Sequence, residues 1–332
     1  MKKITAAITA VGKYLPEYVL TNKILEGMVD TTSDWILTRT GIQERRILKG
    51  EGKGSSYMAI RAGNDLLAKS NVNPKEIDLV IIATATPDMK AASTAAFVAT
   101  EIGAMNAFSF DLESACSSFL FGMSVASTYI ESGKYKKVLL IGSDMNSSFI
   151  DYTDRKTCII FGDGAGAVLF EPNNEGFGLV DEYLRSDGSG RDFLKVEAGG
   201  SLYPPTHETI DQKKHFVHQE GKTVFKYAVS NMADAAEKLL VRNQLEKDDV
   251  DWLVAHQANK RIIDATASRF DLDESKVMMN IEKYGNTTSA TLPLLLNDYE
   301  NQLKKGDKLI FAAFGGGFSW GAIYLTWAYN KN

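Results

Sequence analysis

The chain has 332 residues, of which 44% are hydrophobic, and a formal net charge of −5. This length allows two domains or one large α/β body, and the apolar content is sufficient for a packed core. The acidic balance argues against a protein that coats nucleic acid, and two cysteines are too few for a disulfide framework. No segment has the roughly 20 apolar residues that a membrane helix needs, so we expect a cytoplasmic protein that does not cross a membrane.

Strand-like and helix-like segments alternate along the chain. Residues 1–20 are interpreted as a first β-strand and not a signal peptide, because polar residues interrupt the apolar stretch early. One continuous apolar run follows Asp78 and another follows Asp251. Three more such runs are Val138–Ile141, Ala167–Phe170 and Leu309–Ala312. Such runs, without polar alternation, are typical of strands that are buried on both faces.

The order of these segments repeats at one offset. Asp78 and Asp251 lie 173 positions apart, and glycines that end helical and strand patterns recur at the same spacing. Unrelated α/β units can share such patterns by chance, but the constant offset favours a duplication. We therefore predict an α/β fold with two pseudo-repeated halves, 1–172 and 173–332, each with a mostly parallel sheet.

Cys116 lies where an apolar strand ending at Asp111 gives way to a helical pattern, among small residues. A thiol at a helix N-terminus is close to unpaired backbone N–H groups, which lower its pKa and favour the thiolate. A lone cysteine among small residues can equally be a buried structural residue. Cys158 lies among β-branched residues with no helix start nearby and is interpreted as a core residue.

A histidine and an asparagine occupy related places in the second half. His256 follows the apolar run Trp252–Ala255, at a strand end, where α/β folds place their chemistry. Asn286 lies in a glycine-containing turn before a helix, and Ser289 in this turn is 173 positions from Cys116. A structural histidine and an ordinary turn asparagine are the alternatives. If the halves face one another, these residues surround one point.

Two glycine-rich turns have different interpretations. Gly162–Gly166 does not fit nucleotide phosphate binding, because an apolar strand follows it in place of a helix start. Gly315–Gly317 follows an apolar run, where glycines allow either close approach to a ligand or tight strand packing. The other histidines lie in a polar insert with no third ligand nearby, so no metal site is expected.

Five motifs together resemble the 3-oxoacyl-[acyl-carrier-protein] synthase III family of condensing enzymes, nearly end to end. They are SACSS around Cys116, HQAN at His256–Asn259, GNT at Gly285–Thr287, FGGGFSWG at Phe314–Gly321 and DWILTRTGIQERR at Asp34–Arg46. The resemblance implies a five-layered αβαβα thiolase fold, a homodimer and no cofactor. It implies acyl-CoA and malonyl-acyl carrier protein (malonyl-ACP) as substrates, ACP as a partner, and initiation of type II fatty-acid synthesis.

The resemblance also assigns roles to residues. Cys116 would carry the acyl group, with His256 and Asn286 as hydrogen-bond donors to the malonyl thioester during decarboxylation. The backbone N–H groups of Cys116 and Gly316 would form an oxyanion hole. The residues implied for CoA binding are Trp35, Arg39 and Arg155. Those implied for ACP binding are Gln257, Ala258, Asn259, Lys260, Arg261, Lys226 and Arg269, for which a solvated helix face is the alternative.

The chain departs from the family where many members carry an aromatic-proline pair after the TPD turn. It has Ala91 and Ala92 there, which suggests a pocket that admits branched or longer primers. A family relative with a specialised product remains as an alternative, such as a ketosynthase for aryl or dialkyl products. Hydroxymethylglutaryl-CoA synthase would need a catalytic glutamate, and a biosynthetic thiolase would need a second catalytic cysteine, which FGGGFSWG lacks. A non-catalytic acyl-CoA or carrier-binding homologue would be expected to have lost the nucleophile.

Overall fold

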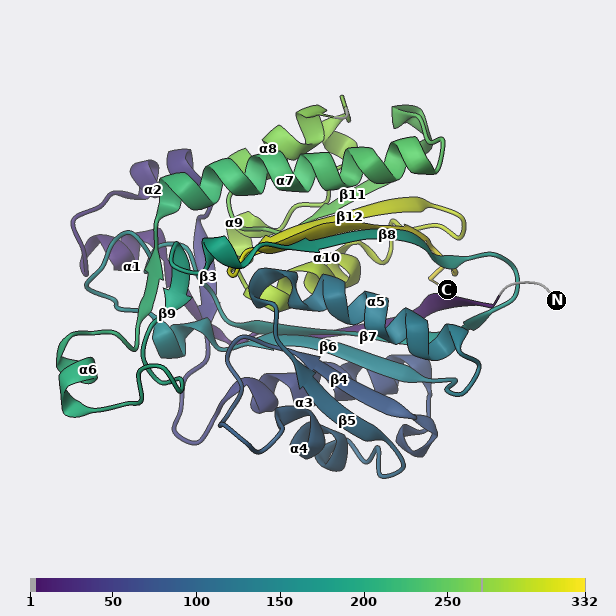
Figure 1. Ribbon diagram of the computed structural model, residues 1–332, viewed down its shortest axis with the longest axis horizontal. Coiled ribbons are helices and arrows are strands. Elements are labelled where there is room, and N and C mark those ends of the chain that lie inside the picture. The colour runs from purple at the N-terminus through teal and green to yellow at the C-terminus, as the bar shows by residue number, and fades with distance from the viewer. Residues whose placement is uncertain (1–3, 270, 332) are drawn as a thin grey trace.

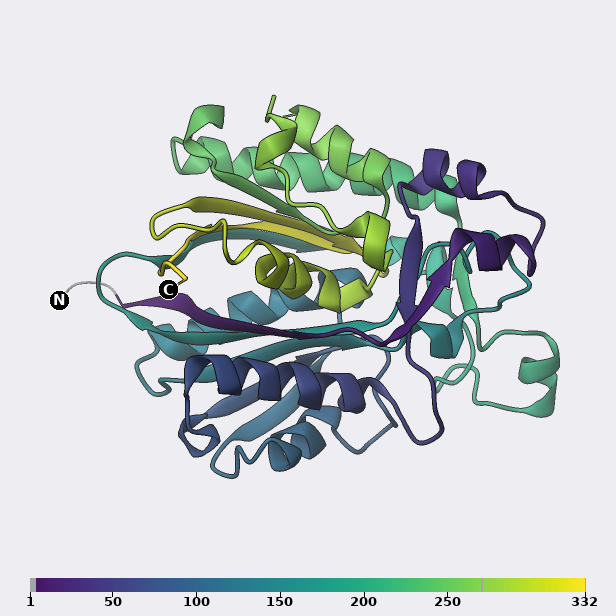
Figure 2. The same ribbon diagram turned by 180° about the vertical axis from the view of Figure 1, so that it is seen from behind.

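The computed structural model describes residues 4–269 and 271–331. Two β-sheets and three helical layers alternate in the order αβαβα (Figure 1), which confirms the predicted fold class. Seen from behind, the same layers run the length of the molecule (Figure 2). In the described ranges, no helix is both long and apolar enough to cross a membrane.

The sheet of the first half has five strands in the order β1-β7-β6-β4-β5. These are β1 (Thr5–Tyr14), β4 (Leu79–Ala83), β5 (Phe108–Leu112), β6 (Val138–Asp144) and β7 (Gly164–Asn173). Every strand except β7 points the same way. Strands β4 and β6 are buried at every residue, as their unbroken apolar sequences predict.

The sheet of the second half has four strands in the order β11-β12-β13-β8. These are β8 (Gly178–Ser186), β11 (Trp252–Ala255), β12 (Lys308–Gly315) and β13 (Ser319–Thr326). Only β13 opposes the common direction. The strands are thus mostly parallel in both sheets. The division at residue 172 stays a prediction, although the first sheet ends at Asn173 and the second begins at Gly178.

Helices cover both outer faces and fill the space between the sheets (Figure 1). The outer layers are α3 (Ser55–Ser70) with α4 (Thr94–Glu101), and α7 (Gly221–Arg242) with α8 (Lys260–Arg269). The middle layer is α5 (Ser118–Glu131) with α10 (Thr291–Tyr299). Smaller elements cluster at one end of the sheets: α1 (Asn22–Glu26), α2 (Ser33–Thr40), α6 (His207–Asp211), α9 (Ile281–Tyr284), and the hairpins β2–β3 (Tyr18–Thr21, Glu44–Ile47) and β9–β10 (Leu194–Val196, Val217–Gln219).

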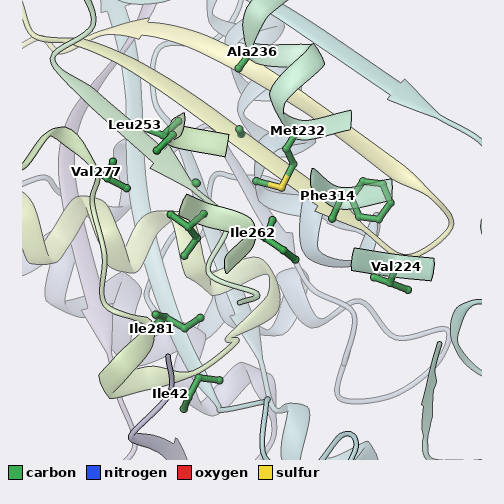
Figure 3. Packing of buried hydrophobic residues seen from close by; sticks show 14 of the residues in the cluster. Ile42, Val224, Met232, Ala236, Leu253, Ile262, Val277, Ile281 and Phe314 are labelled. Carbon is green, nitrogen blue, oxygen red and sulfur yellow. The ribbon is translucent and has the colours of Figure 1, made fainter. Parts of the chain in front are cut away.

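The core is continuous between the halves. One cluster joins Phe119 and Met123 of α5 to Leu292 and Leu295 of α10, all 0–1% exposed. A second lies between α7, α8 and the second sheet (Figure 3), where Met232 and Ile262 approach Phe314. Burying one such side chain stabilises the fold by about 1.5 to 3 kcal/mol. Helices α5 and α10 of the middle layer must be apolar on two opposite faces, because one sheet covers one face and the second sheet covers the other.

The duplication inferred from the sequence is visible in the structure. Strands β4 and β11 begin 173 positions apart, and so do helices α5 and α10. A short 3-10 helix precedes each middle helix, at Ala115–Ser117 and Thr288–Ala290. Ala115 and Thr288 both have a left-handed backbone, with φ of +47° and +53°. The two halves therefore repeat even the strained residue of these turns.

Candidate active site

Cys116 lies in the 3-10 turn that leads into α5, as the sequence predicts, but its thiol is not activated in the expected way. Its side chain is buried, and burial raises the pKa of the thiol to about 12, with the charge of Asp144 as the second cause. Hydrogen bonds from Asn286 and Thr288 oppose this rise. The expected lowering of the pKa by the helix terminus is wrong for this structure, because desolvation of the thiolate dominates.

His256 follows β11 directly and faces the same point. Its backbone N–H donates to Ala312 O on β12 at 2.8 Å, and only 1% of the residue is exposed. Neither ring nitrogen has a hydrogen-bond partner among the residues described. Burial lowers the pKa of the imidazole to about 3, so the ring is neutral near pH 7. A neutral imidazole has one N–H donor and one acceptor nitrogen to offer a ligand.

Asn286 is held rigidly by its own turn. Its backbone N–H donates to Ile160 O at 2.9 Å, and its carbonyl accepts from Gly162 N at 3.0 Å. The side-chain Oδ1 accepts from Thr288 N at 2.9 Å. Because the carbonyl end of the amide is occupied in this way, the NH₂ end remains as the donor toward Cys116.

A cavity of about 510 Å³ joins these residues. Cys116, His256, Asn286 and Gly316 all line it, as do apolar side chains of α7 and α8. The strand end carrying Gly316 is close to the nucleophile, because a Cβ added at Gly315 would lie only 2.9 Å from Cys116 N. Tight packing of the strand end on the turn of the nucleophile is therefore the role that the structure shows for Gly315, and only glycine allows it.

The residues predicted to bind CoA lie together, outside the residues that line the cavity. Both guanidinium groups lie over the Trp35 ring, that of Arg39 at 5.5 Å and that of Arg155 at 5.3 Å from its centroid. Helix α2 is placed by Thr32, which caps its N-terminus, and by Gly41, whose absent side chain lets Lys260 pack close. The CoA contacts stay a prediction.

The predicted carrier-binding segment divides into structural and exposed residues. Gln257 is fully buried, and its amide bonds to Ala255 O, Met278 O and two backbone N–H groups, so its side chain cannot reach a partner in this conformation. Asn259 Nδ2 donates to Arg39 O at 2.9 Å, which joins this segment to α2. Ala258 and Asn259 line the cavity.

The cations near this segment also differ. Arg269 pairs with Asp234 and Glu237 of α7, and Lys260 pairs with Asp264. Lys226 and Arg261 are exposed and, in the described part of the chain, form no ion pair. The Arg261 guanidinium instead lies 5.2 Å from the ring centroid of Phe225, a cavity residue. Arg269 is therefore less available to an acidic partner than the sequence suggested.

The cavity has residues that sequence reasoning missed, and it does not include two residues that the sequence associated with the acyl pocket. Ala91 and Ala92 are exposed and are not among the cavity-lining residues of this chain, so they do not set its width within one chain. Glu113 and Ala85 line the cavity near Cys116 instead. A charged residue three positions before the nucleophile was the available signal for Glu113. Thr288 was also findable, as the repeat partner of Ala115.

A thiolase-type αβαβα fold, with a buried cysteine, histidine and asparagine around one cavity between its halves, defines a condensing enzyme. Family profiles agree: the profile of 3-oxoacyl-[acyl-carrier-protein (ACP)] synthase III matches residues 110–188, and that of its C-terminal part matches residues 240–327.

Similarity to known proteins covers nearly the whole chain. The beta-ketoacyl-[acyl-carrier-protein] synthase III of Phocaeicola vulgatus is 54% identical over 330 residues, which cover 99% of each chain. Synthase III 2 of Bacteroides thetaiotaomicron is 53% identical over 99% of this chain and 98% of the relative. The crystal structure of 3-oxoacyl-[acyl-carrier-protein] synthase III from Aquifex aeolicus VF5 has a TM-score of 0.89 at 37% identity, covering 97% of this chain and 100% of that one. This chain belongs to the 3-oxoacyl-[acyl-carrier-protein] synthase III family and is an acyltransferase.

Proposed function

We propose that the chain joins the acyl group of an acyl-CoA to malonyl-ACP by decarboxylative Claisen condensation and so initiates type II fatty-acid synthesis. The observation that carries the proposal is the convergence of Cys116, His256 and Asn286 on one buried cavity. In the first step the Cys116 sulfur attacks the thioester carbon, the bond to CoA breaks, and the thiol proton ends on the CoA sulfur. A covalent intermediate divides one difficult transfer into two easier ones.

The second step needs donors rather than charged groups. When malonyl-ACP loses CO₂, the electron pair of the broken C–C bond develops negative charge on the thioester oxygen. His256 and Asn286 are suited to stabilise that oxygen. His256 is neutral, and neither of its ring nitrogens has a partner in the part of the chain that the structure describes. The Asn286 NH₂ is not the group that bonds to Thr288. The carbanion then attacks the acyl carbon, the bond to Cys116 breaks, and the sulfur leaves as a thiolate that takes one proton from water.

The tetrahedral species at the acyl carbon needs its own stabilisation. We assign this role to the backbone N–H groups of Cys116 and Gly316, which lie on the two facing turns that line the cavity. Losing one such donor typically raises the barrier by about 3 kcal/mol. Each step balances with the chain's own residues, its two substrates and one proton from water, so we propose that no cofactor is required.

A direct assay tests this function. The enzyme is incubated with malonyl-ACP and a panel of acyl-CoAs that includes acetyl-, isobutyryl- and isovaleryl-CoA, and the products are identified by mass. We expect 3-oxoacyl-ACP and CO₂ in equal amounts. Release of CoA without any carrier-bound product would count against condensation. The same panel decides the primer preference, because Ala91 and Ala92 lie outside the cavity lining of one chain and leave the predicted use of branched or longer primers untested. Exclusive use of acetyl-CoA would contradict that prediction.

Carrier docking is proposed at Lys226 and Arg261, beside the cavity, where an acidic carrier meets unpaired cations in the described chain. We expect Arg261→Gln to raise the KM for malonyl-ACP about fivefold, as loss of about 1 kcal/mol predicts. Acylation by acyl-CoA should change less than twofold. Steady-state kinetics for each substrate measure the difference.

Arg269→Gln on the same helix is the matched control. Because Asp234 and Glu237 already hold Arg269, this change should leave the KM for malonyl-ACP near its original value. Equal effects of both substitutions would argue for a diffuse electrostatic attraction and against docking at Arg261.

Trp35, Arg39 and Arg155 are proposed for CoA because guanidinium and indole groups suit adenine and phosphate.

We also propose a homodimer that works in the cytoplasm. Strand β5 is the edge of its sheet, and exposed apolar side chains lie on it and beside it: Phe97, Met105 and Phe108, at 51%, 64% and 40% exposure. A second copy pairing at this edge would cover them. Sedimentation equilibrium should give twice the chain mass, whereas a monomer at micromolar concentration would contradict the proposal.

A further inference from the structure

The candidate active site has two turns, one that carries Cys116 and one that carries Asn286. Each turn packs closely against a strand of the opposite half of the chain. Gly315 of β12 packs on the backbone of Cys116, and Gly142 of β6 packs on the carbonyl of Ser289, where an added Cβ would clash. These glycines lie 173 positions apart, and so do Cys116 and Ser289. This close packing of a glycine on the opposite turn is therefore a symmetric feature of the duplicated fold.

The symmetry fails at Asp144, two residues after Gly142. The residue at the equivalent position in the second half is Gly317, which has no side chain. Of the two active-site turns, therefore, the one that carries Asn286 is bonded to a carboxylate from this position, and the one that carries Cys116 is not. Asp144 is completely buried. Its Oδ1 accepts from Ala85 N at 2.7 Å, Thr86 N at 3.1 Å, Thr84 Oγ1 at 3.1 Å and Thr86 Oγ1 at 3.0 Å. Its Oδ2 accepts from Ser289 N at 2.9 Å and from Ser289 Oγ.

The two oxygens of Asp144 thus serve different halves of the molecule. Oδ1 fixes the turn after β4, which places Ala85 in the cavity wall, and Oδ2 fixes the end of the Asn286 turn. An ionised carboxylate can satisfy all these donors because it only accepts. Asparagine cannot, since whichever way its amide is turned, the NH₂ group faces a backbone N–H.

The Asn286 turn needs such support because its backbone is strained. Thr288 is β-branched yet has a φ of +53°, a left-handed conformation that such residues rarely adopt. Asn146, two residues after Asp144, accepts from Thr288 Oγ1 at 2.8 Å and donates to Gly162 O at 2.6 Å. Thr288 N in turn orients the Asn286 amide. Asn146, just after β6, therefore holds Thr288, the residue that orients the Asn286 amide.

We infer that Asp144 is a positioning residue, which acts through Ser289 and with Asn146 to keep the Asn286 amide directed at the reacting thioester. The inference rests on the proposed function, because it needs Asn286 to act in decarboxylation. Asp144 is fully buried outside the cavity lining, so it does not touch a substrate there. Its contribution is the fixed geometry of a donor, and displacement of such a donor by about 1 Å can cost about a hundredfold in rate.

A double-mutant cycle tests the inference. Asp144→Asn should lower CO₂ release from malonyl-ACP by about ten- to a hundredfold while acylation by acyl-CoA falls less than threefold. In an Asn286→Ala background the same substitution should cost less than threefold, because the donor it positions is already absent. Ser289→Ala, which keeps the backbone bond to Asp144, should show the same selective loss to a smaller degree if Asp144→Asn does not fold.

Asp163→Asn is the matched control. Asp163 is equally buried and accepts from Leu48 N and from Ser147, but bonds to no residue of the Asn286 turn. It should lose thermal stability without a selective loss of CO₂ release. If Asp144→Asn costs as much with Asn286→Ala as without it, or if acylation falls equally, the inference is wrong. If Asn286→Ala alone leaves CO₂ release intact, the proposed role of Asn286 fails first and the inference with it.

Discussion

Replacing Cys116 with alanine is expected to abolish the covalent acyl-enzyme. The intact mass of the wild-type protein should increase by one acyl group after incubation with acyl-CoA, and that of Cys116→Ala should not. The reason is that the proposed transfer requires a sulfur at the end of the cavity, and no other cysteine lines it among the described residues. Because the acyl-enzyme does not form in Cys116→Ala, the condensation activity of this variant should also fall below detection.

Cys158→Ala is the control for this experiment. Cys158 is also buried, at 1% exposure, and burial raises the pKa of its thiol to about 11, so the two thiols are matched in burial and protonation. It does not line the cavity. Its removal should leave acylation intact at a modest cost in stability, within about 1 to 3 kcal/mol. An adduct that persists in Cys116→Ala and disappears in Cys158→Ala would reverse the assignment.

The second large effect is expected for His256→Ala and Asn286→Ala. Each should still become acylated at Cys116, yet lose CO₂ release from malonyl-ACP by a factor of about 10² to 10³, the usual cost of one oxyanion donor. Acylation measured by intact mass and ¹⁴CO₂ release measured in parallel separate the two steps. Because burial holds the pKa of His256 at about 3, activity should not fall with histidine protonation between pH 7 and 5.

Asn280→Ala provides a comparison for Asn286→Ala. Asn280 is equally buried, at 4% exposure, but its side chain bonds to Asp298, away from the cavity. Its loss should affect both steps alike, through stability. Condensation that survives both His256→Ala and Asn286→Ala would show that the malonyl oxygen is stabilised elsewhere, for example by the backbone near Gly316.

The electrostatics of the site could not be inferred from local sequence. Near Cys116 in the sequence only the helix terminus acts on the thiol, and it would lower the pKa. Burial among both halves and the charge of Asp144, 28 positions away, raise that pKa instead. Gln257 and Arg269 are less accessible for docking than the sequence suggested, for the same reason. Their partners lie on β-strand ends and on α7, and only the packed fold brings these together.

The sequence by itself determined the duplication at offset 173, the buried strands and the three residues that converge on the cavity. It could do so because apolar runs and repeated spacing are local properties, and because a twofold repeat implies which turns face one another. The tertiary structure alone decided the protonation of Cys116 and His256, the exposure of Ala91 and the hydrogen bonds by which Asp144 joins two turns. These depend on desolvation and on hydrogen bonds between residues far apart in the chain, which arise only when the two sheets close around their shared helices.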